Sequence, residues 1–350
     1  MNLFKPSKLL RLLRLAWKLP RNDVNKGLFD RNKVQRISTT LFLTVIVLAI
    51  LILAGCTKKS QTPVYKGKPV KIGFQVCNSK QETLTRFKPM VAYLSRETGR
   101  KFEIELIDTH DMDAVAGLEN LDFFHTNSLA YVVLNRNHGA QVFLGEKRGK
   151  DGAFTTGGIV VRKDSKIKTL KDLKGKSMIF GPMLAPSAYM AQYNLMMDAG
   201  LDPELDLSFY TIPDGSFKHE KVAYGLFFDK FDAAAMPMID FELMIKEAKI
   251  KRSDFRVIAE SKKFPYCNFS AGQGTDEELV SEVKEALLKL DKNTTVEVDG
   301  ETVKVLKAAW LDGYQDIDDK DFDVIRTMAK RADMPPYQNY GNLDPGQDQH

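Results

Sequence analysis

The sequence predicts an α/β fold with mostly parallel sheets and helices on both faces of each sheet. Short runs rich in β-branched and aromatic residues, such as VKIGFQV (70–76) and GGIVVR (157–162), alternate with runs such as 84–94, where apolar residues recur at helical spacing. Alternation of this kind favours parallel strands joined by helices. The composition, 43% hydrophobic and 28% charged over 350 residues, is that of a globular protein long enough for two domains.

The chain begins with a basic leader at 1–37. The leader contains ten lysines and arginines against two aspartates, so it carries eight net positive charges and the rest of the chain carries three net negative ones. A basic body that binds nucleic acid is therefore not expected. The leader is expected to stay on the cytoplasmic side of a membrane, with the body outside.

An export signal is predicted at 38–55. Leu41 to Gly55 is an uncharged run of 15 residues that ends in small residues before Cys56, and a basic flank, a short apolar core and a small-residue exit are the parts of such a signal. The ending LAGC resembles a bacterial lipobox, which implies cleavage before Cys56 and a lipid on its sulfur. The alternative is an uncleaved membrane anchor. The polar stretch 56–69 is interpreted as a tether.

The body is expected to begin near residue 70. A helix is expected to start at Thr275, with Thr275 and Glu278 as a capping box, and the tail 334–350 is expected to fray. Further strands are expected at 101–108, 121–127, 140–147, 176–182, 207–213, 231–237, 256–261 and 267–274, and further helices at 187–197, 217–228, 240–248, 303–311 and 321–331.

Patterns of enzyme and metal chemistry are missing from the sequence. The five histidines lie far apart and neither HExxH nor CxxC occurs, so no metal site and no cofactor are predicted. No GxSxG elbow occurs, and an enzyme built on Cys77 or Cys267 would have no local signature. In an exported protein these two cysteines either form a disulfide or remain buried free thiols.

The loops after the predicted strands carry the candidate binding residues, because ligands of open α/β sheets lie at the carboxyl ends of strands. Ser187 stands at a helix start, where its hydroxyl either caps the helix or leaves the helix N–H groups free for an anion. His219, also near a helix start, either contacts a ligand or lies at the surface. Further candidates in these loops are Asn78, His110, His125, Asn127, Ser128, Tyr131, Ala188 and Tyr189.

Several of these candidates have an ordinary structural alternative. His125 lies beside two phenylalanines and suits a packed core histidine, and Tyr131 suits a buried helix tyrosine. Asn127 and Ser128, at a strand-to-helix turn, suit helix caps. Both interpretations stay open for each of these residues.

The order of five motifs resembles a known family. The motifs VKIGFQV, MVAYLSRETG, LDFFHTNSLAYV, GGIVVRKDSKIKTLKDLKGKSMIFG and GSFKHEKVAYGLFFDKFDAA resemble those of the type II periplasmic binding proteins of phosphate, phosphite and phosphonate ABC transporters. The resemblance covers about residues 70–333. It implies two lobes with a ligand cleft between them, a small anionic ligand, a membrane permease as partner and no covalent chemistry; we expect a monomer.

The anion loop departs from the family pattern. The family has Ser-Thr-Ser-Gly at a helix start, whereas Ala-Pro-Ser-Ala stands at 185–188, so only Ser187 is kept. A hydrogen bond to a charged group contributes about 1.5–3 kcal/mol. The loss of two hydroxyls is therefore expected to weaken phosphonate binding by about 3–6 kcal/mol, or about two to four decades.

Other family positions are matched in part. The family histidine matches His219, the aspartate that follows it matches Asp232, for which we expect a structural role, and the tyrosine of the LAY motif matches Tyr131. Where the family often has a tyrosine after the second strand, this chain has His110. The acidic residue that receives the amino group of aminoalkyl phosphonates would fall near Met238.

Together these observations predict a solute-binding lipoprotein of an ABC importer, exported and lipid-anchored through Cys56. The first lobe would hold 70–152 and 265–333 and the second lobe 153–264, closing around a small oxyanion of the phosphate, phosphite or phosphonate type. The alternative is a receptor that reports a different ligand to a membrane kinase or another partner.

Overall fold

The computed structural model describes residues 65–118, 120–216 and 218–338, which belong to one compact unit. The predicted leader, export signal, Cys56 and most of the tether lie outside the described residues, as does most of the predicted tail. Within the described ranges, no helix is both long and apolar enough to cross a bilayer.

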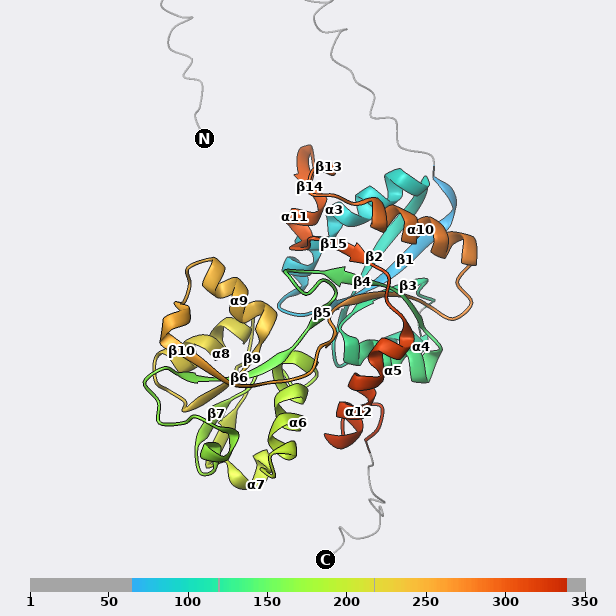
Figure 1. The fold of residues 1–350 in the computed structure, drawn as a ribbon. Helices are drawn as coiled ribbons and strands as arrows, with labels where there is room; N and C mark the ends of the chain where they lie inside the picture. The colour runs from blue at the N-terminus through green and yellow to red at the C-terminus, as the bar shows by residue number, and fades with distance from the viewer. Residues whose placement is uncertain (1–64, 119, 217, 339–350) are drawn as a thin grey trace, which may run out of the picture. The chain divides into compact units, whose positions relative to one another are not determined.

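The first sheet has six strands in the order β15-β4-β12-β3-β1-β2 (Figure 1). One face packs on α3, α10 and α11 through a core that includes Phe74, Phe87 and Phe269, and the other face packs on α4 and α5. Helices therefore cover both faces, as predicted. The elements are β1 (Lys66–Val76), α3 (Lys80–Thr98), β2 (Arg100–Asp108), α4 (Met112–Leu118), β3 (Phe123–Thr126), α5 (Ser128–His138), β4 (Gln141–Lys147), β12 (Asn268–Ala271), α10 (Glu277–Lys289), β13 (Thr295–Val298), β14 (Glu301–Lys304), α11 (Val305–Ala309), β15 (Gly313–Gln315), η4 (Asp319–Phe322) and α12 (Asp323–Arg331).

The second sheet has five strands in the order β10-β6-β9-β7-β8. Side chains of β6 alternate between two cores: Ile159 and Val161 lie in the core that also holds apolar residues of α6, and Val160 lies in the core with α8 and α9. The elements are β6 (Gly157–Arg162), η1 (Leu170–Leu173), β7 (Ser177–Ile179), η2 (Pro186–Met190), α6 (Ala191–Asp198), α7 (Pro203–Asp206), β8 (Phe209–Thr211), α8 (Lys218–Phe227), β9 (Ala233–Pro237), α9 (Met238–Lys246), η3 (Arg252–Asp254) and β10 (Phe255–Glu260).

Both sheets are mixed, so the prediction of mostly parallel sheets is wrong. β1 runs parallel to β2 and β3, and β7 runs parallel to β8 and β9, but β12 lies antiparallel between β3 and β4, and β6 lies antiparallel between β9 and β10. The reason is the path of the chain. β6 and β12 each follow a crossing from the other sheet, so each enters its new sheet at the edge where the parallel strands end.

Two short crossing strands and a shared apolar core connect the sheets. β5 (Phe154–Thr155) pairs with β11 (Phe264–Pro265) in antiparallel fashion. The C-terminal helix α12 contacts both α5 and α6, and Asn194 Nδ2 donates to the carbonyl of Met328 at 3.2 Å. The two sheets are therefore joined on the side of α12 by a buried apolar contact that includes residues of both.

Two local predictions need correction. The cap of α10 is Asp276, whose side chain accepts from Leu279 N, while Thr275 Oγ1 donates to the distant carbonyl of Asp122. The helix expected at 303–311 begins only at Val305, because the residues before it form the second strand of the β13–β14 hairpin.

Candidate functional site

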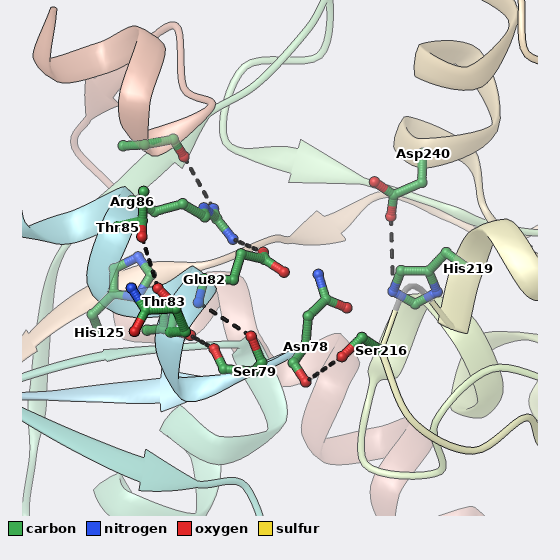
Figure 2. A network of polar contacts seen from close by, with 12 residues as sticks. Asn78, Ser79, Glu82, Thr83, Thr85, Arg86, His125, Ser216, His219 and Asp240 are labelled. Carbon is green, nitrogen blue, oxygen red and sulfur yellow. Dashed lines mark hydrogen bonds and ion pairs between the residues drawn. The ribbon is translucent and has the colours of Figure 1, made fainter. Parts of the chain in front are cut away.

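The candidate site lies where loops at the carboxyl ends of both sheets meet. Ser216 Oγ, in the loop after β8, donates to the carbonyl of Asn78 after β1 at 3.0 Å. Asn127 Nδ2, after β3, donates to the carbonyl of Leu184 after β7 at 3.0 Å. Figure 2 shows the side chains of Glu82 and Arg86 on one side and those of His219 and Asp240 on the other. We call the region that these four side chains border the cleft.

The start of α3 supplies part of the first side of the cleft. Ser79 is the N-cap, and its Oγ accepts from Glu82 N at 3.1 Å (Figure 2). Arg86 lies one turn further, 3.6 Å from the Glu82 carboxylate, and donates to the carbonyl of Ala309 at 3.0 Å. Arg86 is therefore a mostly buried cation that already has a carboxylate and a carbonyl as partners.

A buried contact between a histidine and a glutamate lies beneath this helix. His125 Nε2 contacts Glu146 Oε1, and the imidazole packs between aromatic rings, with its centroid 4.4 Å from that of Phe87. Burial by itself raises the pKa of Glu146, but the charges of His125, Arg86 and Arg148 outweigh burial and leave this pKa below its ordinary value. Glu146 is therefore ionised at neutral pH, and His125 is the core histidine of the structural alternative.

Arg148 connects Tyr266, which follows β11, to the second side of the cleft. Its Nη2 lies 3.4 Å from Asp240 Oδ1, and its Nη1 donates to Tyr266 Oη at 3.1 Å. Both charged side chains are only 15% exposed. Burial acts to lower the pKa of Arg148, but Tyr266 and Asp240 raise it above the ordinary value, so the guanidinium stays charged.

Both predicted cysteines border this region and are free thiols. Cys77 is exposed, and the protein around it raises the pKa of its thiol. Burial also raises the pKa of Cys267, and the charge of Glu146 raises it further. Of the two alternatives for these cysteines, the structure therefore has the unpaired thiols.

The helix start around Ser187 differs from the expected anion site. The N-cap is Ala185, whose carbonyl accepts from both Ala188 N at 3.0 Å and Tyr189 N at 3.2 Å. The amides of Ala188 and Tyr189 therefore already have a backbone acceptor. Ser187 is not the cap, because the cap position is occupied by Ala185, and Ser187 is 7% exposed.

A buried glutamine and a glycine hold this helix start against the second sheet. Gln192 Nε2 donates to the carbonyl of Ser187 at 2.8 Å and also to carbonyls of β6 and β9. A Cβ at Gly157 would lie 2.6 Å from Ala191 Cβ and 3.0 Å from the Ser187 carbonyl. The position of Ser187 therefore depends on the missing side chain of Gly157.

His219 and Asp240 form the rest of this side. His219 Nε2 lies 3.9 Å from Asp240 Oδ2 (Figure 2). Its Nδ1 lies 3.4 Å from the point that a Cβ of Gly181 would occupy. His219 Nδ1 and Asp240 Oδ2 are both inaccessible and have no hydrogen-bond partner among the described residues. The structure thus brings His219 next to the segment that carries Ala188.

The remaining candidates lie away from this meeting point. Tyr131 is fully buried and its hydroxyl donates to Asp319 at 2.6 Å, so it is the buried helix tyrosine of the alternative. Tyr189 packs on Phe180 in the core. Ser128 Oγ donates to the carbonyl of Pro265 at 2.7 Å.

Two further predicted positions have clear local roles. Asn127 caps α5 through its Oδ1, as the alternative proposed, and also contacts Leu184. His110 is exposed on the turn after β2, the edge strand of the first sheet. Asp232 accepts from Ser177 N at 2.9 Å and joins the loop before β9 to β7, which is a structural role.

Sequence reasoning missed four charged cleft residues: Glu82, Arg86, Arg148 and Asp240. Arg148 directly follows β4, and Asp240 lies in the first turn of the helix after β9. Both residues therefore lie at the carboxyl ends of strands, which is where ligands of open α/β sheets bind, and this position is the signal that predicts them. Among the residues that the structure describes, no group of three His, Cys, Asp or Glu side chains is arranged to hold a metal ion.

Comparisons with known proteins agree with this architecture. A family model described as "ABC transporter, phosphonate, periplasmic substrate-binding protein" matches residues 72–322. The binding protein component of a phosphonate ABC transporter from Pseudomonas aeruginosa superposes with a TM-score of 0.59 at 19% identity, covering 74% of this chain and 85% of that chain. A Prochlorococcus marinus protein in complex with methylphosphonate gives 0.61 at 16% identity, covering 76% and 98%. These similarities show the type II periplasmic-binding-protein fold.

A sensor kinase is also similar in sequence. The tetrathionate sensor histidine kinase of Salmonella typhimurium is 29% identical over 190 residues, which are 53% of this chain and 31% of the kinase. The chain therefore matches about a third of that relative's length.

Proposed function

Because the chain belongs to the periplasmic substrate-binding proteins of phosphonate ABC transporters, we propose that it binds a small oxyanion of the phosphate, phosphite or phosphonate type outside the cytoplasm and presents it to a membrane permease. The approach of His219 and Arg148 to the same carboxylate, that of Asp240, with the segment that carries Ala188 beside His219, supports the oxyanion most directly. The helix start at Ser187 offers a hydroxyl, His219 an imidazole edge and Arg148 a charged guanidinium. Binding and release need no covalent chemistry from these groups.

The ligand would bind between two lobes that open and close. The first would hold 70–152 and 265–333, and the second 153–264. The direct contacts Ser216–Asn78 and Asn127–Leu184 join the strand-end loops of the two lobes. Because α12 contacts helices of both sheets, opening would pivot on the side of α12 and separate the loops on the cleft side.

The test is stabilisation of the full-length chain, purified in detergent, by a panel of phosphate, phosphite, methylphosphonate, sulfate and small carboxylates. A ligand at 100 times its Kd stabilises the folded state by about 2.7 kcal/mol, which raises Tm measurably. The double variant Ser187→Ala, His219→Ala loses two hydrogen bonds to the anion and is expected to bind about two to four decades more weakly.

A matched control keeps the same substitutions outside the cleft. Ser253 lies exposed in η3, and His138 lies at the end of α5 with Asp113 as its partner. The variant Ser253→Ala, His138→Ala should respond to ligands as the wild type does. A Tm shift with a neutral organic ligand and none with any oxyanion would contradict the proposed ligand class.

The attachment to the membrane is a further part of the proposal. We propose that Cys56 is lipidated after cleavage and that the tether holds the binding unit near its permease, which raises its local concentration there. Mass spectrometry of the protein from membranes should find an N-terminal lipid-modified Cys56, and Cys56→Ala should release the processed protein or leave the precursor uncleaved. An unmodified Cys56 within an uncleaved chain would support the anchor alternative.

The similarity to a sensor kinase favours a second candidate function. A binding protein of this fold can report its ligand to a membrane kinase instead of a permease, and tetrathionate is the ligand named for the relative. Photo-cross-linking of the full chain in its native membrane distinguishes the two: a permease partner supports import, and a histidine kinase partner supports sensing.

A further inference from the structure

α8 carries exposed aromatic side chains at the end that lies away from the cleft. His219 is the second residue of this helix, and the last residue, Phe227, lies about 12 Å further along the helix axis. Phe228 comes directly after the helix and is 64% exposed, and its ring centroid lies 5.1 Å from that of Phe227, which is 38% exposed. Single exposed apolar residues are common on protein surfaces, but contiguous ones are typical of an interaction site.

A pocket lies directly beside these two rings. Its volume is about 440 Å³, and Phe227 and Phe255 form its apolar lining, with ring centroids 6.2 Å apart. Residues 162–164, at and after the end of β6, and residues 253–254, before β10, form its polar lining. Pockets of this volume accommodate groups at least as large as a phenyl ring. The same surface therefore carries a protruding ring and, next to it, a cavity with aromatic walls that such a ring fits.

The charges around the pocket are only partly compensated within the chain. Arg162 lies 2.6 Å from Asp164 and 3.6 Å from Asp229, so its charge is balanced locally. Lys163 and Asp254 also line the pocket, and neither makes an ion pair with any residue that the structure describes. One ammonium and one carboxylate without counter-charges suit a partner that presents the same two groups in reverse.

We propose that this surface is a two-fold interface between two copies of the chain, in which Phe228 of each copy enters the pocket of the other. In a two-fold interface the same patch serves both copies, so every contact occurs twice with the roles exchanged. Phe228 then packs against Phe227 and Phe255 of the second copy, and Lys163 of each copy faces Asp254 of the other. This dimer replaces the monomer expected from the sequence.

Other occupants account for fewer of these features. An anionic lipid surface would cover the rings but repel the carboxylate of Asp254. A small ligand in the pocket would leave Phe228 exposed. A second copy supplies a ring for the pocket, a pocket for the ring and the opposite charge for each unpaired group.

The interface would leave the cleft open. All of its residues belong to the segment 153–264 of the second lobe, and none lies at the start of α8, where His219 borders the cleft. The two second lobes would form a fixed centre, and each first lobe would remain free to move.

The first test is photo-cross-linking of the full chain in its native membrane with Phe228→p-benzoylphenylalanine. The inference predicts a product of twice the chain's mass, in which peptide mass spectrometry finds position 228 joined to residues 162–164 or 253–255 of a second copy. A cross-link to another protein or to lipid, or no cross-link, would overturn the inference.

The second test measures the dimer dissociation constant of the purified full-length chain by sedimentation equilibrium in density-matched detergent. Phe228→Ser removes the central aromatic anchor and should raise this constant at least about 30-fold. The matched control is Leu205→Ser, because Leu205 is 81% exposed in α7 of the same lobe and lies outside the pocket and the ring pair. The control should dimerise as the wild type does, and the Tm of each variant reports whether it is folded.

A charge exchange tests the orientation of the two copies. Lys163→Glu and Asp254→Lys should each raise the dissociation constant about tenfold, because each places like charges opposite one another, and the combined variant should return to within about threefold of the wild type. A monomeric wild type, an unchanged constant in folded Phe228→Ser, or a combined variant as weak as the single ones would overturn the inference. Neither measurement uses a ligand, so these outcomes leave the proposed function unaffected.

Discussion

The buried pair of His125 and Glu146 predicts the effect of one substitution, Glu146→Gln. Glu146 is 1% exposed at the end of β4 and contacts His125, whose ring packs against Phe87. The substitution keeps the shape of the side chain and removes its charge. His125 then loses its carboxylate neighbour among aromatic rings, while Arg86 and Arg148 each lose a neighbouring negative charge.

The expected loss of stability is large. Removal of one charged partner from a buried pair costs about 3–5 kcal/mol, and we expect the lower end because the glutamine amide can still hydrogen-bond to the imidazole. For a body of this size, 3 kcal/mol corresponds to a fall in Tm of about 6–12 °C at pH 7, measured by circular dichroism. The control is Glu103→Gln on β2: Glu103 pairs with Lys101 near the surface, and such pairs contribute less than about 1 kcal/mol.

The pH dependence gives the refuting result. The pKa of Glu146 is lower in the folded than in the unfolded protein, so its charge stabilises the fold above the unfolded pKa, and this stabilisation is lost as the pH falls through the folded pKa. The difference in Tm between wild type and Glu146→Gln should therefore narrow as the pH falls below the ordinary glutamate pKa of about 4.3. A constant difference over that range, or a variant as stable as Glu103→Gln, would refute the reasoning.

Three further substitutions or reactions test the site. In Gly181→Ala the new Cβ would lie 2.5 Å from Ala188 Cβ, so the helix start must move. We expect the free energy of unfolding, measured by thermal melts, to fall by about 1–3 kcal/mol and ligand binding to weaken. Unchanged binding would contradict the placement of this segment. Asn127→Ala removes the cap of α5 and the hydrogen bond to the Leu184 carbonyl. The free energy of unfolding should fall by about 1 kcal/mol, and ligand dissociation, followed by stopped flow, should be faster. An unchanged dissociation rate would show that this hydrogen bond does not hold the lobes closed. Iodoacetamide should label the exposed Cys77 before Cys267, as measured by peptide mass spectrometry. Both thiols should react more slowly than free cysteine because their pKa values are raised. Labelling of Cys267 before Cys77 would contradict the placement of the two thiols.

The sequence predicted where the strands lie better than the direction in which they run. The run 157–162 is a strand because its apolar side chains alternate between two cores, and this period is visible locally. Its antiparallel pairing with β9 is not visible locally, since it follows from the crossing between sheets. The alternation of strands and helices suggested parallel pairing throughout, and that rule fails where a strand follows a crossing instead of a helix on its own sheet.

Helix starts show the same limit on a smaller scale. Thr275 and Asp276 are both good caps by residue type, and the long-range bond from Thr275 to Asp122 decides between them. The β13–β14 hairpin, by contrast, has a local signal in the sequence. Asp299 and Gly300 stand between runs with alternating valines, which is typical of a two-residue hairpin turn.

The charges of the cleft explain why the candidate site was predicted only in part. Arg86 is four residues from Glu82 on one helix and Arg148 follows a strand, so each has an ordinary local explanation when considered alone. Their significance arises only when the carboxyl ends of two sheets bring Arg148 to Asp240, 92 positions apart by their residue numbers. The folded cleft places the carboxylate of Asp240 between a guanidinium and an imidazole. No local pattern of charge in the sequence predicts this placement, because each of the three side chains comes from a different strand-end segment.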